Sequence, residues 1–244
     1  MKLSRVMLAS LGMCLVLSGS ALGQSGTITG TVKFAGTSPA QKPFAVSSAY
    51  LGCGKDQPLD RLVLGKENGV ANSVVYIEGL KRTGPPSTNL FVIDQHGCHY
   101  TPHVLVVPDG DAFTVTNSDS MFHNVHGYFD ATHATAFNLA QPTKGMKIVQ
   151  RVKKPGMYQL RCDVHPWMNA YVFVAGGGYA AATNADGKYT LANLPPGTYK
   201  VTLWHEGWKS KDAGGRPDFS EAVQQSQQVM VVGGKSATAD FSLK

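Results

Sequence analysis

Short segments in which apolar and polar residues alternate recur along the chain, separated by turns rich in Gly and Pro. Between residues 27 and 34, Ile28, Val32 and Phe34 fall on one face, while threonines and a lysine fall on the other. This period of two is typical of half-buried β-strands, and no segment sustains a helical period. Similar segments occur at 73–77, 90–93, 104–107, 112–116, 147–152, 157–162, 171–174, 180–183, 188–191, 198–204, 228–232 and 237–243. The pattern predicts an all-β fold, in which only 218–227 could form a short helix.

The first 23 residues have the pattern of an export signal. Lys2 and Arg5 precede the apolar run 6–17, and small residues lead to Gly23. That run is shorter than the roughly 20 residues a membrane-spanning helix needs. We therefore expect 1–23 to be a cleaved signal peptide, and the mature protein to be periplasmic or secreted without a membrane span.

The charge balance argues neither for nor against an acidic partner, but the local sequence pattern excludes some classes of ligand. The chain has 22 Lys and Arg against 16 Asp and Glu, and two of the basic residues lie in the predicted signal. The remaining positive charge is scattered, with no basic cluster among aromatic residues and no glycine-rich phosphate loop. We therefore expect neither nucleic acid nor nucleotides as ligands. The mature length suffices for one large β domain or two small ones.

Three cysteines remain once Cys14 is removed with the signal. In an oxidising compartment two of them can pair and one stays free. Cys53 and Cys98 each follow a glycine in loop-like sequence, whereas Cys162 lies in a different context. A Cys53–Cys98 disulfide is therefore predicted, and it would tie the N-terminal segment to the rest of the fold.

Cys162 ends the predicted strand 157–162, where alternation places it on the inward face and Gln159 on the outward face. The next residues, 163–168, contain Pro166, which disfavours a helical conformation for the residue before it. An open loop of this kind can fold several side chains back over one point.

A second segment ends in a histidine in a similar way. The predicted strand 112–116 leads through the polar loop 118–120 to His123. One thiolate, two imidazoles and a thioether form a soft donor set that suits copper. The predicted ligands are His123, Cys162, His165 and Met168. The alternatives are a metal-free sandwich and a structural zinc site, although zinc would prefer another Cys, His or carboxylate to a methionine.

Residues 97–175 resemble the cupredoxin family. The spacing of Cys162, His165 and Met168 is similar to that of amicyanins, and the GDxxxxxN run at 110–117 with His123-Asn124-Val125 resembles the segment of plastocyanins that carries the first copper histidine. The resemblance implies a Greek-key β-sandwich over 96–175 that binds one type 1 (blue) copper ion. It also implies that Asn124 ties the two ligand loops together. Arg161 and Asp163-Val164 depart from the family pattern, which leaves the redox potential open.

The C-terminal part resembles a second family. The runs NADGKYTL at 184–191 and LPPGTY at 194–199 are similar to carboxypeptidase regulatory-like, transthyretin-like domains. The resemblance implies a smaller accessory β-sandwich over 176–244 and no peptidase activity, because no zinc-binding set is present. Residues 176 onward lack segments that match the opening strands of that family. The N-terminal β segment 24–95 could therefore supply the first half of a discontinuous module.

A copper ion with four protein ligands has no open position for a substrate, so we expect no catalysis. The expected function is transfer of single electrons between periplasmic redox partners. His165 would bring the electron to the surface within an apolar docking patch formed by Met121, Phe122, Pro166 and Trp167. Two alternatives stay open: copper storage or delivery to a copper enzyme, and a scaffolding or binding module without metal.

Two further groups of residues could form a second site. His96, His99 and His103 surround Cys98 with metal-like spacing. The pair His205-Glu206 lies between two tryptophans, for which an interdomain packing patch is the favoured interpretation. His126 is expected on a loop surface.

Overall fold

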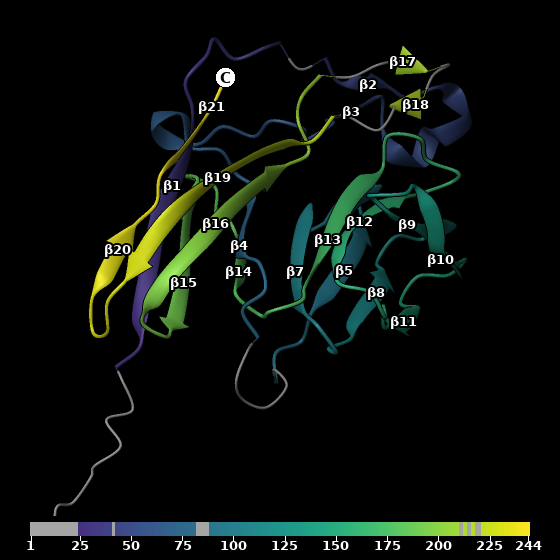
Figure 1. Cartoon of the computed structure of the whole chain (residues 1–244). Helices are drawn as coiled ribbons and strands as arrows, with labels where there is room; N and C mark the ends of the chain where they lie inside the picture. Colours follow the sequence, from purple (N-terminus) through teal and green to yellow (C-terminus); the bar gives the residue numbers. More distant parts are fainter. Residues whose placement is uncertain (1–23, 41, 82–87, 210–211, 214–215, 218–220) are drawn as a thin grey trace, which may run out of the picture.

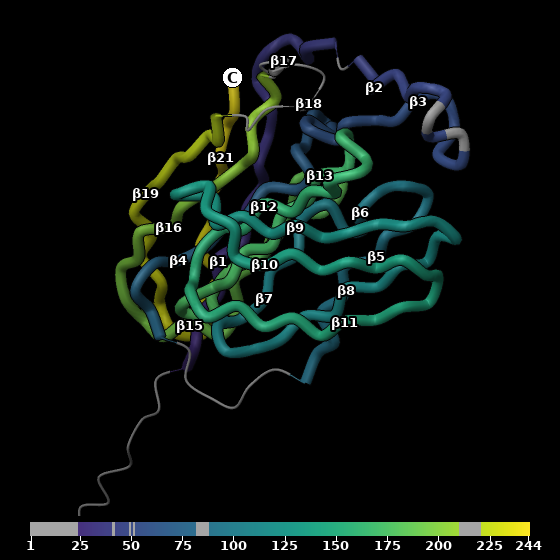
Figure 2. Tube along the Cα trace, turned by 90° about the vertical axis from the view of Figure 1, so that its right-hand side faces the viewer, coloured from purple at the N-terminus to yellow at the C-terminus, as the bar shows by residue number. Residues whose placement is uncertain are grey.

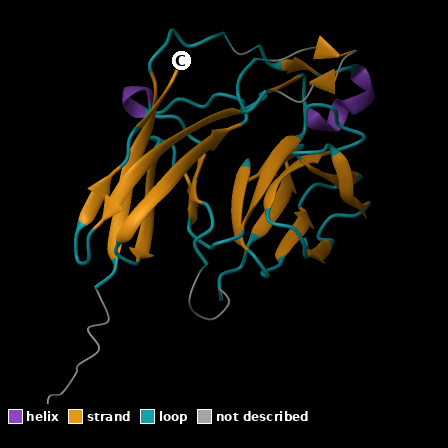
Figure 3. Cartoon of the chain, in the orientation of Figure 1, coloured by secondary structure: helices purple, strands orange, loops and turns teal. Residues whose placement is uncertain are grey.

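The computed structural model describes residues 24–244 apart from 41, 82–87, 210–211, 214–215 and 218–220, so the predicted signal peptide lies outside the described residues. The described residues form β-strands and two short 3-10 helices, η1 (Ser48–Cys53) and η2 (Lys66–Asn68), as Figure 3 shows. None of the helices in these ranges has the length and apolar composition needed to cross a membrane. The predicted all-β class is confirmed.

The strands form two β-sandwiches that lie side by side (Figure 1). One sheet of the first sandwich contains β15 (Lys188–Leu194), β1 (Gly26–Phe34), β20 (Ser236–Thr238) and β21 (Phe241–Leu243). The other contains β14 (Ala180–Ala182), β4 (Val74–Ile77), β16 (Gly197–His205) and β19 (Val223–Val231). Ile28, Val32, Val75 and Leu203 lie fully buried between these sheets.

The first sandwich is built from both ends of the chain. β1 pairs antiparallel with β15 and parallel with β20 and β21. β4 pairs antiparallel with β14 and β16. The alternating apolar face of β1 is thus buried by β4 together with strands from the C-terminal part of the chain.

The second sandwich carries the predicted ligands. Its larger sheet has the order β10 (Ala134–Gln141), β9 (His123–Phe129), β12 (Gly156–Arg161), β13 (Asn169–Ala175) and β7 (Val104–Pro108). The facing sheet contains β11 (Lys147–Gln150), β8 (Phe113–Asn117), β5 (Val92–His96) and β6 (His99–Thr101). The pairs β13–β7 and β5–β8 are parallel, whereas the other strand pairs of these two sheets are antiparallel. β5 belongs to this sandwich although it begins before residue 96.

The two sandwiches share an apolar interface. Val74 and Trp204 of the first pack with Met157, Tyr171 and Phe173 of the second. Gln159 lies on the same face of β12 and is only 1 % exposed; its amide donates to the Asn169 side chain (2.7 Å) and the Tyr171 hydroxyl (3.3 Å). Alternation predicts the face of a strand correctly here, but the outward face of the sheet meets a second domain instead of water.

Two predictions about secondary structure are wrong. The helix considered for 218–227 is contradicted at 223–227, which begin the edge strand β19, and 218–220 lie outside the described residues. Glutamines stand on both faces of this strand, so apolar alternation does not mark it. β9 and β10 are missing from the predicted strands. In β9, two histidines and an asparagine occupy both inward and outward positions, so apolar and polar residues do not alternate. Tertiary contacts decided the structure of these segments, not local alternation.

A further segment crosses the end of the second sandwich. We call residues 44–57 the cover segment; it contains β2 (Phe44–Ala45), η1 and β3 (Asp56–Gln57), and both views place it beyond the strand ends (Figures 1 and 2). The predicted disulfide joins Cys53 of this segment to Cys98, with an S–S distance of 2.04 Å.

Candidate metal centre

The structure brings three of the predicted ligands together. His123 begins β9 and Cys162 follows β12, and these strands are antiparallel neighbours, so their ends meet at one edge of the sheet. The Nδ1 atoms of His123 and His165 are 3.0 Å apart, and Cys162 Sγ lies 3.5 Å from His165 Nδ1. All three side chains are buried, and their donor atoms lie within 4.8 Å of one another. Two imidazoles and one thiol therefore converge on a single point.

The loop 163–168 folds back on itself to achieve this convergence. The Cys162 N–H donates to the Met168 carbonyl (3.4 Å), and the Met168 N–H donates to the His165 carbonyl (3.0 Å). The Met168 side chain is buried, and Met168 follows His165 by three residues in the sequence. The predicted role of its thioether as a weak fourth ligand stays a prediction.

Asn124 connects the two ligand segments. Its Oδ1 accepts the Asp163 N–H at 2.7 Å and lies 3.4 Å from Cys162 Sγ. Its Nδ2 donates to Asp163 Oδ2 (2.7 Å) and to the Asn138 side chain (2.8 Å). Because the Asn124 side chain spans from β9 to the loop after β12, it fixes the position of His123 relative to Cys162. The cupredoxin resemblance implies this role for Asn124.

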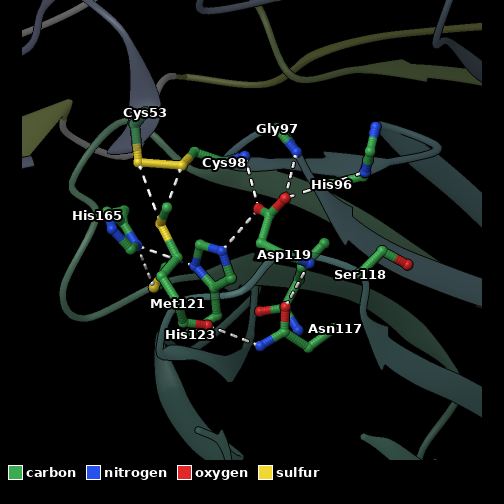
Figure 4. A network of polar contacts seen from close by, with 12 residues as sticks. Cys53, His96, Gly97, Cys98, Asn117, Ser118, Asp119, Met121, His123 and His165 are labelled. Atoms are coloured by element: carbon green, nitrogen blue, oxygen red, sulfur yellow. Dashed lines mark hydrogen bonds and ion pairs between the residues drawn. A yellow bond between two sulfur atoms is a disulfide. The ribbon is translucent and has the colours of Figure 1, made fainter. Parts of the chain in front are cut away.

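Asp119 contacts the centre and was missed in the sequence. Its Oδ2 lies 2.9 Å from His123 Nε2 and accepts the Cys98 N–H (2.9 Å), while Oδ1 accepts the Gly97 N–H (2.8 Å), as Figure 4 shows. The bond to Nε2 leaves Nδ1 of His123 directed at His165. The only signal in the sequence is an acidic residue four positions before a candidate ligand.

Asn117, the last residue of the GDxxxxxN run, shapes the loop that carries Asp119. Its Oδ1 accepts the Asp119 N–H (3.0 Å), and its Nδ2 donates to the carbonyls of Met121 and Gln141, each at 2.9 Å. The buried Asn117 amide thus supplies hydrogen-bond partners to backbone groups around the loop, and these bonds fix the loop conformation.

Burial controls the protonation of the donors. Burial lowers the pKa of His123, although Asp119 opposes this, and burial together with the neighbouring His123 lowers the pKa of His165 to about 4. Burial also raises the pKa of the Cys162 thiol. Near neutral pH both imidazoles therefore have lone pairs available, and binding of a metal would release the thiol proton.

Asp119 is a charged group at the site. Burial works against ionisation of its carboxyl group, but the Cys98 and Gly97 N–H groups and the His123 ring outweigh it, so that the pKa of Asp119 is lowered. A carboxylate bonded to the far nitrogen of a ligating histidine fixes the ring and raises its basicity.

The docking patch expected around His165 does not form as predicted. His165 is only 6 % exposed and Trp167 only 2 %, because the cover segment lies over both. The Tyr50 ring is 5.5 Å from the His165 ring and 5.3 Å from the Trp167 ring, and the Trp167 indole N–H donates to the Cys98 carbonyl at 3.0 Å.

The other members of that patch are divided. Phe122 is 43 % exposed and Pro166 is half-buried, whereas the Met121 side chain turns inward to the disulfide. A depression of about 540 Å³ remains between the cover segment and the ligand loops. It is lined by Tyr50, Gly52, Cys53, Ser120, Met121, Phe122, Val164 and His165. This depression is where His165 faces the surface.

The remaining histidines do not share a site. His96 lies 4.0 Å from Asp119, His99 lies 4.0 Å from Asp60, and His103 bonds Glu206. His126 lies within β9, not in a loop, with Nδ1 at 3.0 Å from Asp163.

Glu206 belongs to the interface between the sandwiches. It accepts from the Asn169 side chain at 3.2 Å as well as contacting His103, and it is 3 % exposed. Trp204 packs in the same interface, which bears out the interdomain packing patch for Trp204 and Glu206, whereas Trp208 packs against Phe34 of the first sandwich.

One family model matches the chain. Residues 164–244 match the carboxypeptidase regulatory-like domain. The match begins in the ligand loop and covers β13 of the second sandwich. It leaves out β1 and β4, which complete the first sandwich in space. The predicted resemblance of the C-terminal part is confirmed.

Several solved structures resemble part of the chain. A copper-containing nitrite reductase from Thermus scotoductus SA-01 has 21 % identity and a TM-score of 0.31 over 40 % of this chain and 24 % of its own. A novel purple cupredoxin from Nitrosopumilus maritimus has 25 % identity and a TM-score of 0.30 over 35 % and 99 %. A reduced amicyanin variant has 24 % identity and a TM-score of 0.32 over 41 % and 97 %. The chain thus spans about a quarter of the nitrite reductase. No curated protein matches it.

Proposed function

We propose that this protein holds one type 1 copper ion between His123, Cys162, His165 and Met168 and passes single electrons between redox partners outside the cytoplasm. The observation that carries this proposal is the convergence of two buried imidazole nitrogens and one buried thiol within 4.8 Å. Copper bound there would supply a one-electron couple. Four protein donors leave no position for a substrate, so we propose no catalytic role.

The donor set fits copper better than zinc. Two imidazoles, a thiolate and a weak thioether are the ligands of blue copper sites. Structural zinc sites take four strong donors, and a methionine is a poor replacement for the fourth. The carboxylate of Asp119, which would be a good zinc ligand, is directed at His123 Nε2 on the far side of the ring from His165.

The chain's own residues keep the donor geometry fixed. Asn124 ties Cys162 to the segment of His123, Asp119 orients the His123 ring, and burial excludes water. A site that changes little between oxidation states costs little reorganisation, which favours rapid electron transfer. We propose that the partner docks over the depression beside Tyr50 and Phe122, where His165 comes nearest to the surface. The disulfide supports an oxidising compartment such as the periplasm.

The first test is the visible absorption spectrum of the mature protein after addition of one equivalent of copper(II). We expect an intense thiolate-to-copper charge-transfer band that is absent in Cys162→Ser and retained in the matched control Val164→Ala, whose side chain lies on the rim of the depression. A reversible one-electron couple in a redox titration would support the carrier.

Other outcomes would favour the alternatives. Absence of the band in the wild type would contradict the copper site and favour the scaffolding module. A band combined with rapid loss of copper to a chelator, and without a reversible couple, would favour storage or delivery.

Asp119→Asn should weaken copper(II) binding by about 10- to 100-fold, because the bond that orients the His123 ring loses its charge. The reduction potential should rise, since a negative charge next to the centre stabilises the more positive oxidation state. Chelator competition and a redox titration measure the two effects. The control is Asp109→Asn, which removes the same charge from an exposed turn at the opposite end of β8. An unchanged potential in Asp119→Asn would contradict this role.

A further inference from the structure

The thioether of Met121 lies directly against the disulfide. Its Sδ is 3.5 Å from Cys53 Sγ and 3.4 Å from Cys98 Sγ, as Figure 4 shows. Disulfide sulfurs carry no hydrogen, so these are contacts between sulfur atoms and not hydrogen bonds. A Cβ added to Gly52 would lie 2.5 Å from Met121 Cε, so the glycine before Cys53 leaves room for this approach. Three sulfur atoms are thus packed together.

His165 adds a nitrogen donor to the same group. A ring nitrogen of His165 and the two cysteine sulfurs all lie within 4.8 Å of one another. Cys53, Cys98 and His165 are 7 %, 0 % and 6 % exposed. Two thiolates, a thioether and an imidazole make a soft donor set of the kind that selects copper(I). In the disulfide this set is blocked, because the thiolate is the form of cysteine that binds metals.

We propose that Cys53, Cys98 and Met121, together with His165, form a second copper site, specific for copper(I), that exists only when the disulfide is reduced. The required co-reactant is a dithiol reductant. Its two thiols are oxidised to a disulfide, and the two electrons and two protons convert Cys53–Cys98 into two thiols. Copper(I) then replaces the thiol protons without a change in its own oxidation state.

Access to the sulfurs is asymmetric. Cys53 lines the depression beside His165, whereas Cys98 is fully buried beneath it. A reductant therefore attacks Cys53, and copper(I) enters from the same side. The second site rests on the proposed function in one respect: it shares His165 with the first centre. A copper(I) ion in the second site is thus bound to a ligand of the first centre, through which the first centre can be loaded.

The test counts copper(I) bound by the mature Cys162→Ser protein, in which the first centre is disabled. Binding is measured anaerobically by competition with a chromophoric copper(I) chelator, before and after treatment with a dithiol that is then removed. We expect about one tightly bound equivalent in the reduced protein and none in the oxidised protein. Thiol titration should show two thiols after reduction and none before.

One variant in the same background tests Met121 as a donor, and a second serves as its control. Met121→Leu keeps the disulfide and a similar side-chain volume, and it should weaken copper(I) binding at least tenfold. The matched control Met230→Leu changes a methionine that is 68 % exposed on β19, and it should have no effect.

Equal copper(I) binding by the oxidised and reduced Cys162→Ser proteins would overturn the second site, as would full binding by reduced Met121→Leu. The absorption band of the oxidised wild type tests the first centre separately. A protein with the band but without the reduction-dependent copper(I) would keep the proposed function and lose this site. The reverse result would keep the site and lose the blue copper centre.

Discussion

Glu206→Ala should lower the free energy of unfolding by about 3–5 kcal/mol, the cost of breaking a buried ion pair by removing one partner. Glu206 Oε1 contacts His103 Nε2 across the interface between the sandwiches, and the two side chains are 3 % and 9 % exposed. Without the carboxylate, His103 and the Asn169 amide lose a buried partner in surroundings that contain Tyr171 and Trp204. Urea denaturation followed by tryptophan fluorescence measures the change.

The control for this prediction is the exposed pair Lys33–Glu67, whose side chains are 48 % and 81 % exposed. Glu67→Ala should change stability far less, because solvent screens the exposed pair. If both variants unfold at the same urea concentration, the buried pair does not hold the two sandwiches together.

The contribution of His103 should depend on pH. Burial opposes its charged form, but Glu206 outweighs this effect, and the pKa of His103 is raised above 6.5. A raised folded-state pKa means that the stabilisation is complete below the unfolded-state pKa and is lost as the pH rises through the folded-state pKa. The difference in stability between the wild type and Glu206→Ala should therefore shrink in alkaline solution, which denaturation curves at several pH values would show.

Removal of the disulfide in the double variant Cys53→Ala/Cys98→Ala should cost about 4 kcal/mol. The two cysteines are 45 residues apart in the sequence, and cross-linking a loop of this length lowers the entropy of the unfolded chain by roughly that amount. The folded protein should change locally as well, because the cover segment then rests mainly on the contacts of Phe44 and Tyr50 with Trp167.

Limited proteolysis and copper exchange measure that local change. We expect faster cleavage within 44–57 and faster loss of copper from the first centre to a chelator. In the double variant a dithiol should have no further effect, whereas in the wild type it should reproduce the faster cleavage. Wild-type resistance in the double variant would show that the aromatic contacts alone hold the cover segment.

Much of the candidate site could be predicted because its residues are close in sequence or have distinctive chemistry. Cys162, His165 and Met168 lie within one loop, and the soft donor set requires few assumptions about the fold. The Cys53–Cys98 pairing followed from counting cysteines and comparing their contexts. The accessory sandwich was visible in its turn sequences, as the family match to 164–244 bears out.

Asp119, the covered position of His165 and the sulfur cluster with Met121 could not be predicted. Each depends on contacts between segments that alternation does not relate: Asp119 meets the β5–β6 turn at Gly97 and Cys98, and Met121 meets the cover segment. The docking patch was mispredicted for the same reason. The sequence pattern around an apolar residue such as Trp167 is the same whether the side chain contacts a partner protein or another segment of its own chain.

The sequence by itself determined the all-β class, the disulfide and the convergence of the ligand loop on Cys162, because strand periodicity, cysteine number and short-range spacing are local properties. The tertiary structure alone decided which outward faces meet water. Alternation predicts that Gln159 faces outward, but this side chain is buried where the two sandwiches pack together. The physical reason is that the burial of a residue depends on how much of its surface distant segments remove from solvent. β1 and β4, for example, pair with strands that lie more than a hundred residues later in the sequence.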